Sequence, residues 1–131
     1  MTTIKIKVET EIVVEPQHID DLMVTALEGG INYWCRKAKI ISCPRPEDLA
    51  ENVAAENVLA SDVISKGGVL EMYDAESNDK WELTLEKFLK GLKWYCEKFG
   101  YTDMEDLIDN HDADTADSIV QYALFDEIVF G

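Results

Sequence analysis

The sequence predicts a single α+β domain in which a small, mostly antiparallel sheet is covered by three or more helices. Strand-like alternation and helix-like stripes occupy separate stretches of the 131 residues and do not alternate strictly along the chain. Apolar residues make up 47% of the composition, which is enough for a substantial core at this length. The sequence contains no internal repeat and no low-complexity segment, so one compact domain over residues 1–131 is expected.

Three segments carry the signals of strands. The first is residues 4–8, where Ile and Val alternate with Lys and Glu follows, and this N-terminal strand could extend through Ile12–Val14. The second is the short strand at 38–42 (AKIIS), which ends before Pro44. The third is a hairpin over 69–83, whose two alternating halves flank a polar turn of Ser, Asn and Asp.

Helical periodicity is clearest from Gln17 to Trp34, where apolar residues recur at i, i+3 and i+4. The other helical segments are bounded by glycine or by residues that cap helices well. Their predicted positions are one or two helices within 46–66 that end at Gly67, a helix from the N-cap Thr84 to Gly100, a short helix over 103–108 and a last helix around 119–124.

The stretch ALEGGINYWC interrupts the first helical pattern with Gly29 and Gly30, each of which costs about 1 kcal/mol relative to alanine in a helix interior. Such a pair needs a compensating role. One alternative is that another element crosses close to the backbone at Gly30, which lies on the apolar stripe. The other is that the helix breaks here and presents a ligand-binding segment made of Gly29, Gly30, Asn32, Tyr33, Trp34 and Arg36.

Tyr33 and Trp34 directly precede the most basic stretch of the chain, CRKAK. Aromatic rings beside Arg36 would suit a nucleotide, because a base can stack on the rings while the guanidinium binds phosphate. The alternative is that Trp34 belongs to the core and that the basic residues are a solvated helix end. The periodicity favours the core for Trp34.

Acidic residues exceed basic residues by 27 to 12, which gives a net charge of −15. This balance disfavours direct contact with nucleic acid or with an anionic membrane, and it favours a basic partner. The excess is concentrated in residues 44–83 and 101–131, and the latter segment has nine acids and no base. The predicted partner-binding face consists of Asp103, Glu105, Asp106, Asp109, Asp112, Asp114 and Asp117.

The acidic stretch DNHDADTAD over 109–117 does not predict a metal site. An EF-hand loop needs glycine at position 6 and glutamate at position 12. Counted from Asp112, these positions hold Asp117 and Ala123. Asp112 or Asp114 as a helix N-cap explains the stretch without a metal, so no metal is expected.

Catalytic and cofactor-binding motifs are absent from the sequence. His18 and His111 have no neighbours at zinc-ligand spacing, no serine lies in a GxSxG context, and neither a P-loop nor GxGxxG occurs. The three scattered cysteines are typical of a reduced protein of the cytosol, and no signal peptide or membrane span is indicated. We therefore expect a non-enzymatic cytoplasmic protein without a cofactor.

Four segments resemble a family of small acidic proteins encoded by bacteriophages and prophages: ALEGGINYWC, LASDVISKGGVLEMYDAE, WELTLEKFLKGLKWY and DADTADSIVQYALFDEIVFG. The resemblance covers most of the chain after residue 16 and is most specific at 26–35 and 112–131. It implies an accessory protein acting in the cytoplasm of the bacterial host, and it supplies no catalytic site. Asp126 departs from the family pattern, which leads us to expect glycine at that position.

Three functions are compatible with these features. The leading hypothesis is an inhibitor of a host protein, such as a defence nuclease, whose nucleic-acid site the acidic face would occupy in imitation of phosphates. The second is a sponge that sequesters a nucleotide signal of host immunity through the glycine amides, Tyr33, Trp34 and Arg36. The third is a phage accessory or structural protein that self-associates through the helix carrying Gly29 and Gly30.

Overall fold

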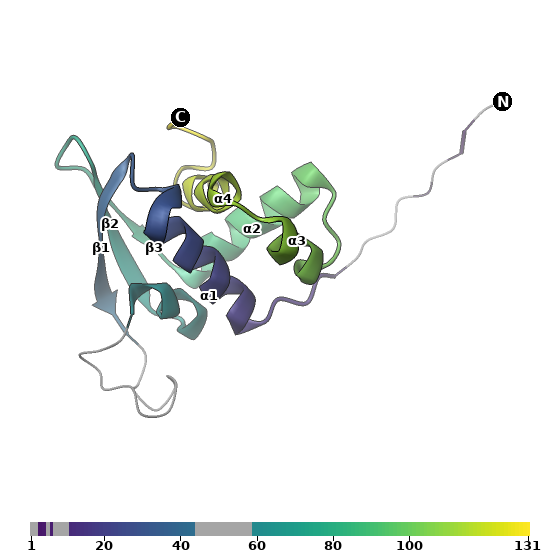
Figure 1. The fold of residues 1–131 in the computed structure, drawn as a ribbon, viewed down its shortest axis with the longest axis horizontal. Helices are drawn as coiled ribbons and strands as arrows, with labels where there is room; N and C mark the ends of the chain where they lie inside the picture. The colour runs from purple at the N-terminus through teal and green to yellow at the C-terminus, as the bar shows by residue number, and fades with distance from the viewer. Residues whose placement is uncertain (1–2, 5, 7–10, 44–58) are drawn as a thin grey trace.

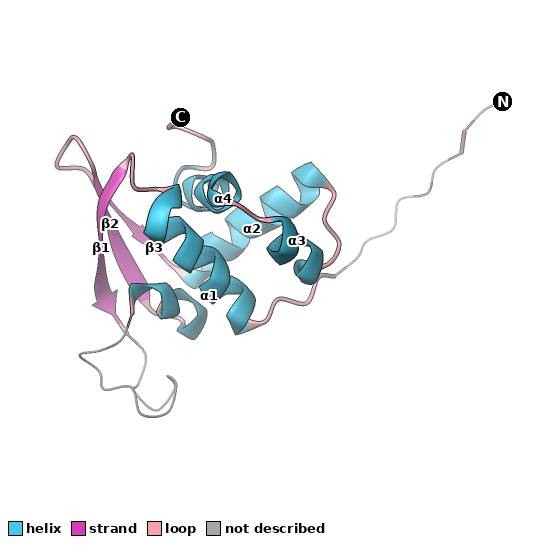
Figure 2. Cartoon of the chain, viewed as in Figure 1, coloured by secondary structure: helices cyan, strands magenta, loops and turns pink. Residues whose placement is uncertain are grey.

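Three strands form an antiparallel sheet in the order β1-β2-β3, and the helices pack against one side of it (Figure 1 and Figure 2). This arrangement confirms the predicted α+β class. The computed structural model describes residues 3–4, 6, 11–43 and 59–131. In this part of the chain, no helix is both long enough and apolar enough to cross a bilayer.

The sheet is built from β1 (Cys35–Ser42), β2 (Val69–Asp74) and β3 (Lys80–Leu83). β2 pairs with both neighbours, so that Cys35 lies opposite Asp74 and Leu70 lies opposite Leu83. The predicted hairpin is therefore confirmed, and the short strand at 38–42 is confirmed as the second half of a longer β1. Every second residue of β2 is buried, which is the pattern of a sheet with one face on the core.

Where the chain is described, the predicted N-terminal strand does not appear in this sheet. Ile4 and Ile6 are 88% and 84% exposed and belong to no strand, and Val8 lies outside the described residues. Ile12–Val14 are also outside any strand, and Ile12 and Val14 pack as half-buried side chains against the core. An alternating pattern makes a strand possible, but a strand forms only where a neighbouring strand supplies hydrogen-bond partners.

The helices are α1 (Pro16–Thr25), α2 (Leu85–Phe99), α3 (Met104–Asn110) and α4 (Ala113–Phe125). Their ends follow from capping residues: the side chains of Thr84, Asp103 and Asp112 accept backbone N–H groups at the starts of α2, α3 and α4. Gly100 ends α2 in the left-handed conformation, with φ of 76°. The three helices predicted after residue 83 are thus confirmed. The last of them begins at Ala113, before the predicted range 119–124.

The predicted helices within 46–66 are replaced, where the chain is described, by two single 3₁₀ turns, η4 (Ala60–Asp62) and η5 (Ile64–Lys66). Gly67 follows them with φ of 86°, as expected for a helix end. Residues 44–58 lie outside the described residues.

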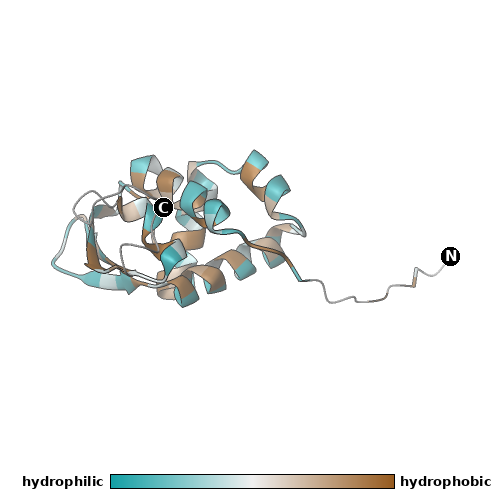
Figure 3. Ribbon diagram, turned by 90° about the horizontal axis from the view of Figure 1, so that it is seen from below, coloured by the Kyte–Doolittle hydropathy of each residue, from teal (hydrophilic) through white to brown (hydrophobic). Residues whose placement is uncertain are grey.

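The core lies between the sheet and the helices. α2 packs along α4, and the two helices lie close together at Gly91, where an added methyl group would meet the carbonyl oxygen of Ile119. Figure 3 shows apolar residues recurring along the helices between hydrophilic ones. The largest fully buried side chains are Trp34, Phe88, Leu22, Met23, Ile31, Ile64, Leu70, Met72, Leu83, Met104, Leu107 and Ile119.

Candidate functional site

Both histidines of the chain join α1 to the α3 region. The Nδ1 atom of His18 accepts the backbone N–H of Glu15 at 3.0 Å, so its Nε2 carries the proton and donates to Glu105 Oε1 at 2.7 Å. His111, which follows α3, bonds through Nε2 to Thr25 Oγ1 at 2.8 Å. These contacts hold the acidic residues of α1 beside those of α3 and of the start of α4.

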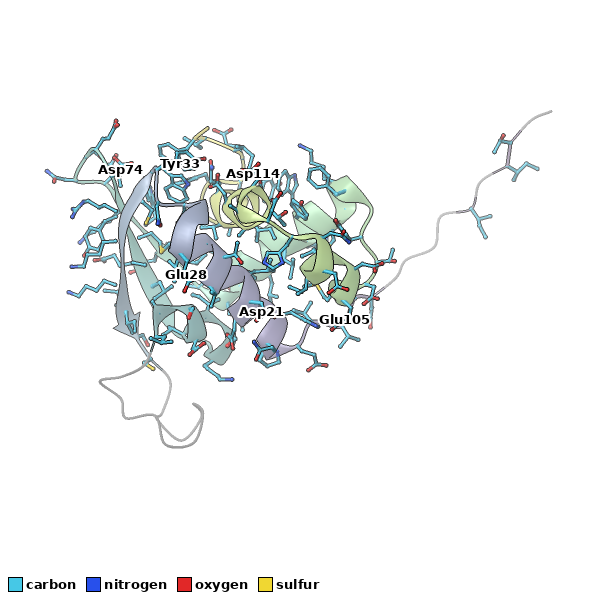
Figure 4. The ribbon with its side chains drawn as sticks, viewed as in Figure 1. Asp21, Glu28, Tyr33, Asp74, Glu105 and Asp114 are labelled. Carbon is cyan, nitrogen blue, oxygen red and sulfur yellow. The ribbon has the colours of Figure 1, made fainter. Side chains whose placement is uncertain are left out.

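The elements joined in this way come from two segments without a single lysine or arginine. Residues 11–34 contain five acids and residues 101–131 contain nine, and neither segment contains a basic residue apart from one histidine each. Their packing makes neighbours of acidic elements from both segments, and Figure 4 labels Asp21, Glu28, Glu105 and Asp114 on α1, η1, α3 and the start of α4. We use the name carboxylate face for the acidic residues that these neighbouring elements and their N-caps carry: Asp21, Glu28, Asp103, Glu105, Asp106, Asp109, Asp112 and Asp114.

Lysine does not neutralise this face within the described residues. The lysine ion pairs there join Lys80 to Glu71, Lys90 to Asp126 and Lys93 to Glu97, all outside the carboxylate face. The described basic residues lie on the sheet, on η5 and on α2. The described basic residues therefore lie on elements other than those of the carboxylate face, and one of these elements, η5 with Lys66, packs against α1.

Besides Glu105, which bonds to His18, two further members of the carboxylate face have structural roles. Asp103 and Asp112 cap α3 and α4, and the hydrogen bonds from Thr115 lower the pKa of Asp112. Asp106, Asp109 and Asp114 are exposed, and their carboxylates make no hydrogen bond to another described side chain. These three are available to a partner without loss of an internal contact.

Asp117 corrects the predicted face, because it lies in the interior at 8% exposure. Its carboxylate accepts hydrogen bonds from Trp34 Nε1 at 2.8 Å, from the hydroxyl of Tyr33 at 2.5 Å and from Gln121 Nε2 at 2.9 Å. The i, i+4 spacing of Asp117 and Gln121 beside the apolar stripe of α4 was a sequence signal for this placement. Counting acids along the chain could not reveal it.

The glycine pair marks the end of the first helix. After Thr25 the helix widens into a π-helical turn, η1 (Ala26–Gly30), closed by a bond from the N–H of Ile31 to the carbonyl of Ala26. The predicted helix is thus too long, since Trp34 lies in the loop before β1. A Cβ atom on Gly30 would lie 2.9 Å from the carbonyl oxygen of Ala113, so close approach to α4 explains this glycine.

Gly30→Ala is expected to lower the free energy of unfolding by about 1–3 kcal/mol, because the added methyl group must displace the backbone at the start of α4. Gly29→Ala is the matched control. No atom lies within 4 Å of the Cβ it would add, so it should be neutral or stabilise by up to about 1 kcal/mol. Urea denaturation of both variants measures the difference, and equal effects would contradict close packing at Gly30.

The residues predicted as a nucleotide-binding segment are not brought to one cavity. Trp34 is 2% exposed and packs in the core, as its periodicity favours. Tyr33 is 54% exposed but is engaged through its hydroxyl, and desolvation together with the Asp117 contact raises its pKa to about 12. Asn32 and Arg36 border a separate hollow of about 230 Å³, and Arg36 donates to the carbonyl of Asp74.

A larger, mainly apolar groove of about 960 Å³ lies between residues 11–14, α2 and the start of α3. Cys96 borders it, and burial raises the pKa of this thiol and of the Cys35 thiol. A raised pKa keeps a thiol protonated and weakens it as a nucleophile. Within the described residues, no three His, Cys, Asp or Glu side chains are grouped so that they could hold a metal ion.

Comparison with known proteins gives no relative from which a function could be transferred: no family model, no curated protein and no solved structure matches this chain. Function is therefore inferred from the surface chemistry of the molecule. Its most distinctive surface is the carboxylate face.

Proposed function

We propose that this chain is a non-catalytic bacteriophage accessory protein that acts in the bacterial cytoplasm. It inhibits a nucleic-acid-binding host protein, such as a defence nuclease, by covering the basic site with the carboxylate face. The observation that carries this proposal is that two acidic segments without lysine or arginine pack against each other. The partner is a cationic protein surface, and the chain itself contacts neither nucleic acid nor membrane.

The chemistry of such a partner supports the proposal. A site that binds phosphates is lined with lysine and arginine, and these side chains form strong charge-assisted hydrogen bonds with carboxylates as well. The exposed carboxylates of α3 and α4 have no internal lysine partner among the described residues, so they can bind without breaking an ion pair. Binding then competes directly with the nucleic acid.

The test is displacement of labelled duplex DNA from a panel of purified bacterial nucleases, repeated at rising salt concentration. We expect the chain to displace DNA from at least one nuclease, with an affinity that falls as salt rises. An affinity independent of ionic strength, or failure to compete with DNA, would exclude mimicry of phosphates.

A charge-matched pair of variants separates this face from overall charge. The triple variant Asp106→Asn, Asp109→Asn, Asp114→Asn should bind about tenfold more weakly or worse, given up to about 1 kcal/mol for each exposed pair. The control triple Glu76→Gln, Asp79→Asn, Glu82→Gln removes the same charge from exposed positions of the hairpin. It should bind within about twofold of the wild type. Equal weakening by both triples would show that only net charge matters.

A further inference from the structure

The segment after α4 folds back onto the loop before β1. It begins at Asp126, which has φ of 59° and is the non-glycine residue with positive φ in the described chain. Aspartate tolerates this left-handed conformation better than most residues, so the helix can end where the phage family leads us to expect glycine. Lys90 pairs with Asp126 at 2.5 Å, and the chain then runs past exposed Ile128 and Val129 to Phe130.

Phe130 fills a slot between aromatic rings from three other parts of the chain. Its ring stacks on Trp34 with centroids 5.1 Å apart and planes 2° apart. The edges of Trp81 and Phe125 close the slot, at centroid distances of 6.3 Å and 5.9 Å from Phe130. We call the set of Trp34, Trp81 and Phe125 the aromatic slot.

Gln121 beside the slot binds the main chain of the same segment. Its Oε1 accepts the backbone N–H groups of Val129 and Phe130, both at 2.8 Å, and its Nε2 donates to the carbonyl of Phe130 at 3.2 Å. These bonds recognise a peptide backbone and no particular side chain. Gln121 is itself 1% exposed and is oriented by Asp117, so it is held in place for this contact.

The segment is therefore bound as a separate peptide would be. One aromatic side chain enters a pocket, the main chain pairs with a fixed amide, and Ile128 and Val129 remain 46% and 50% exposed. None of these contacts requires that the segment be joined to α4. A covalent connection only raises its effective concentration, typically to the millimolar range for a short linker.

We infer that the aromatic slot with Gln121 is a binding site for an extended peptide that carries an aromatic residue, and that residues 126–131 occupy it in cis. A partner peptide of the same chemistry binds when the cis segment leaves, with Asp126 as the hinge. This site is built from residues that do not belong to the carboxylate face, and the inference does not rest on the proposed inhibition.

The test uses the full chain with Phe130→Ala, which empties the slot, and a capped fluorescent peptide of sequence DEIVFG. We expect saturable binding to the variant, and binding to the wild type at least about tenfold weaker because the cis segment competes. A peptide with alanine in place of phenylalanine should not bind. Val129→Ala is the matched control, since it removes a half-exposed side chain and should leave the slot closed.

Absence of binding to a folded Phe130→Ala variant would overturn the inference. If that variant does not fold, amide hydrogen exchange in the wild type decides. The N–H groups of Val129 and Phe130 are protected by Gln121, and millimolar peptide should accelerate their exchange by displacing the segment. Unchanged exchange of these two amides at that concentration would likewise overturn it.

Discussion

Asp117→Ala is expected to lower the free energy of unfolding by about 3 kcal/mol. The carboxylate accepts hydrogen bonds from three donors. One of them, the buried Nε1–H of Trp34, has no other hydrogen-bond acceptor among the described residues. The variant leaves that donor unsatisfied, frees Gln121 to reorient and opens a cavity between α4 and the loop before β1. Chemical denaturation followed by tryptophan fluorescence measures the loss.

Asp117→Asn is the control for this effect. It keeps an oxygen that can accept from Trp34 Nε1 and preserves the volume, so we expect less than half the loss seen with alanine. If Asp117→Ala lowered the free energy of unfolding no more than Asp117→Asn, the hydrogen bonds of the Asp117 carboxylate would not have a central role in stability.

The titration of Tyr33 gives an independent measurement of the same network. Its pKa of about 12 lies above the ordinary value of 10.0, so folding favours the protonated phenol. This contribution to stability is complete below pH 10.0 and is lost as pH rises through about 12. In Asp117→Ala the pKa should return toward its ordinary value, which NMR of labelled tyrosine resolves from the other tyrosines. An unchanged Tyr33 titration would contradict the contact.

Gly91→Ala is expected to destabilise the chain by about 2–3 kcal/mol, although alanine is the better helix former by about 1 kcal/mol. The added methyl group would meet the backbone of α4 at the carbonyl of Ile119 and the N–H of Ala123. Neither group can move without shifting the helix. Thermal and urea denaturation measure the loss, with the open position Gly29 again providing the comparison. Stability equal to the wild type would show that α2 and α4 cross less closely.

Local chemistry made much of the fold predictable. The hairpin over 69–83, the N-cap Thr84, the end of α2 at Gly100 and the cap at Asp112 all depend on residues within a few positions of one another. Capping and turn preferences act between residues a few positions apart, so they can be predicted from a single sequence. The core position of Trp34 was also predicted, but from a helical stripe that ends before Trp34, which reaches the core from the loop before β1.

The incorrect predictions depended on contacts between distant segments. Residues 4–8 and 12–14 have the alternation of a strand but find no neighbouring strand where they are described. The helical turns that begin with α1 end at Gly30, where the start of α4, more than 80 residues later, lies against the backbone. In a count of charges Asp117 looks like one acid among many, and its bonds to the distant Tyr33 and Trp34 hold it inside. The slot around Phe130 likewise combines four separate parts of the chain.

Among the described residues, the elements of the carboxylate face carry no lysine or arginine, whereas β1 carries Arg36, Lys37 and Lys39, so the proposed binding surface and this edge strand differ in the sign of their charge. A cationic surface therefore exerts a torque on the molecule before the two touch, and it turns the carboxylates toward itself. A larger fraction of collisions then begins in an orientation that can proceed to binding. A molecule with the same −15 charge spread evenly would be attracted as strongly from afar but would arrive in random orientations.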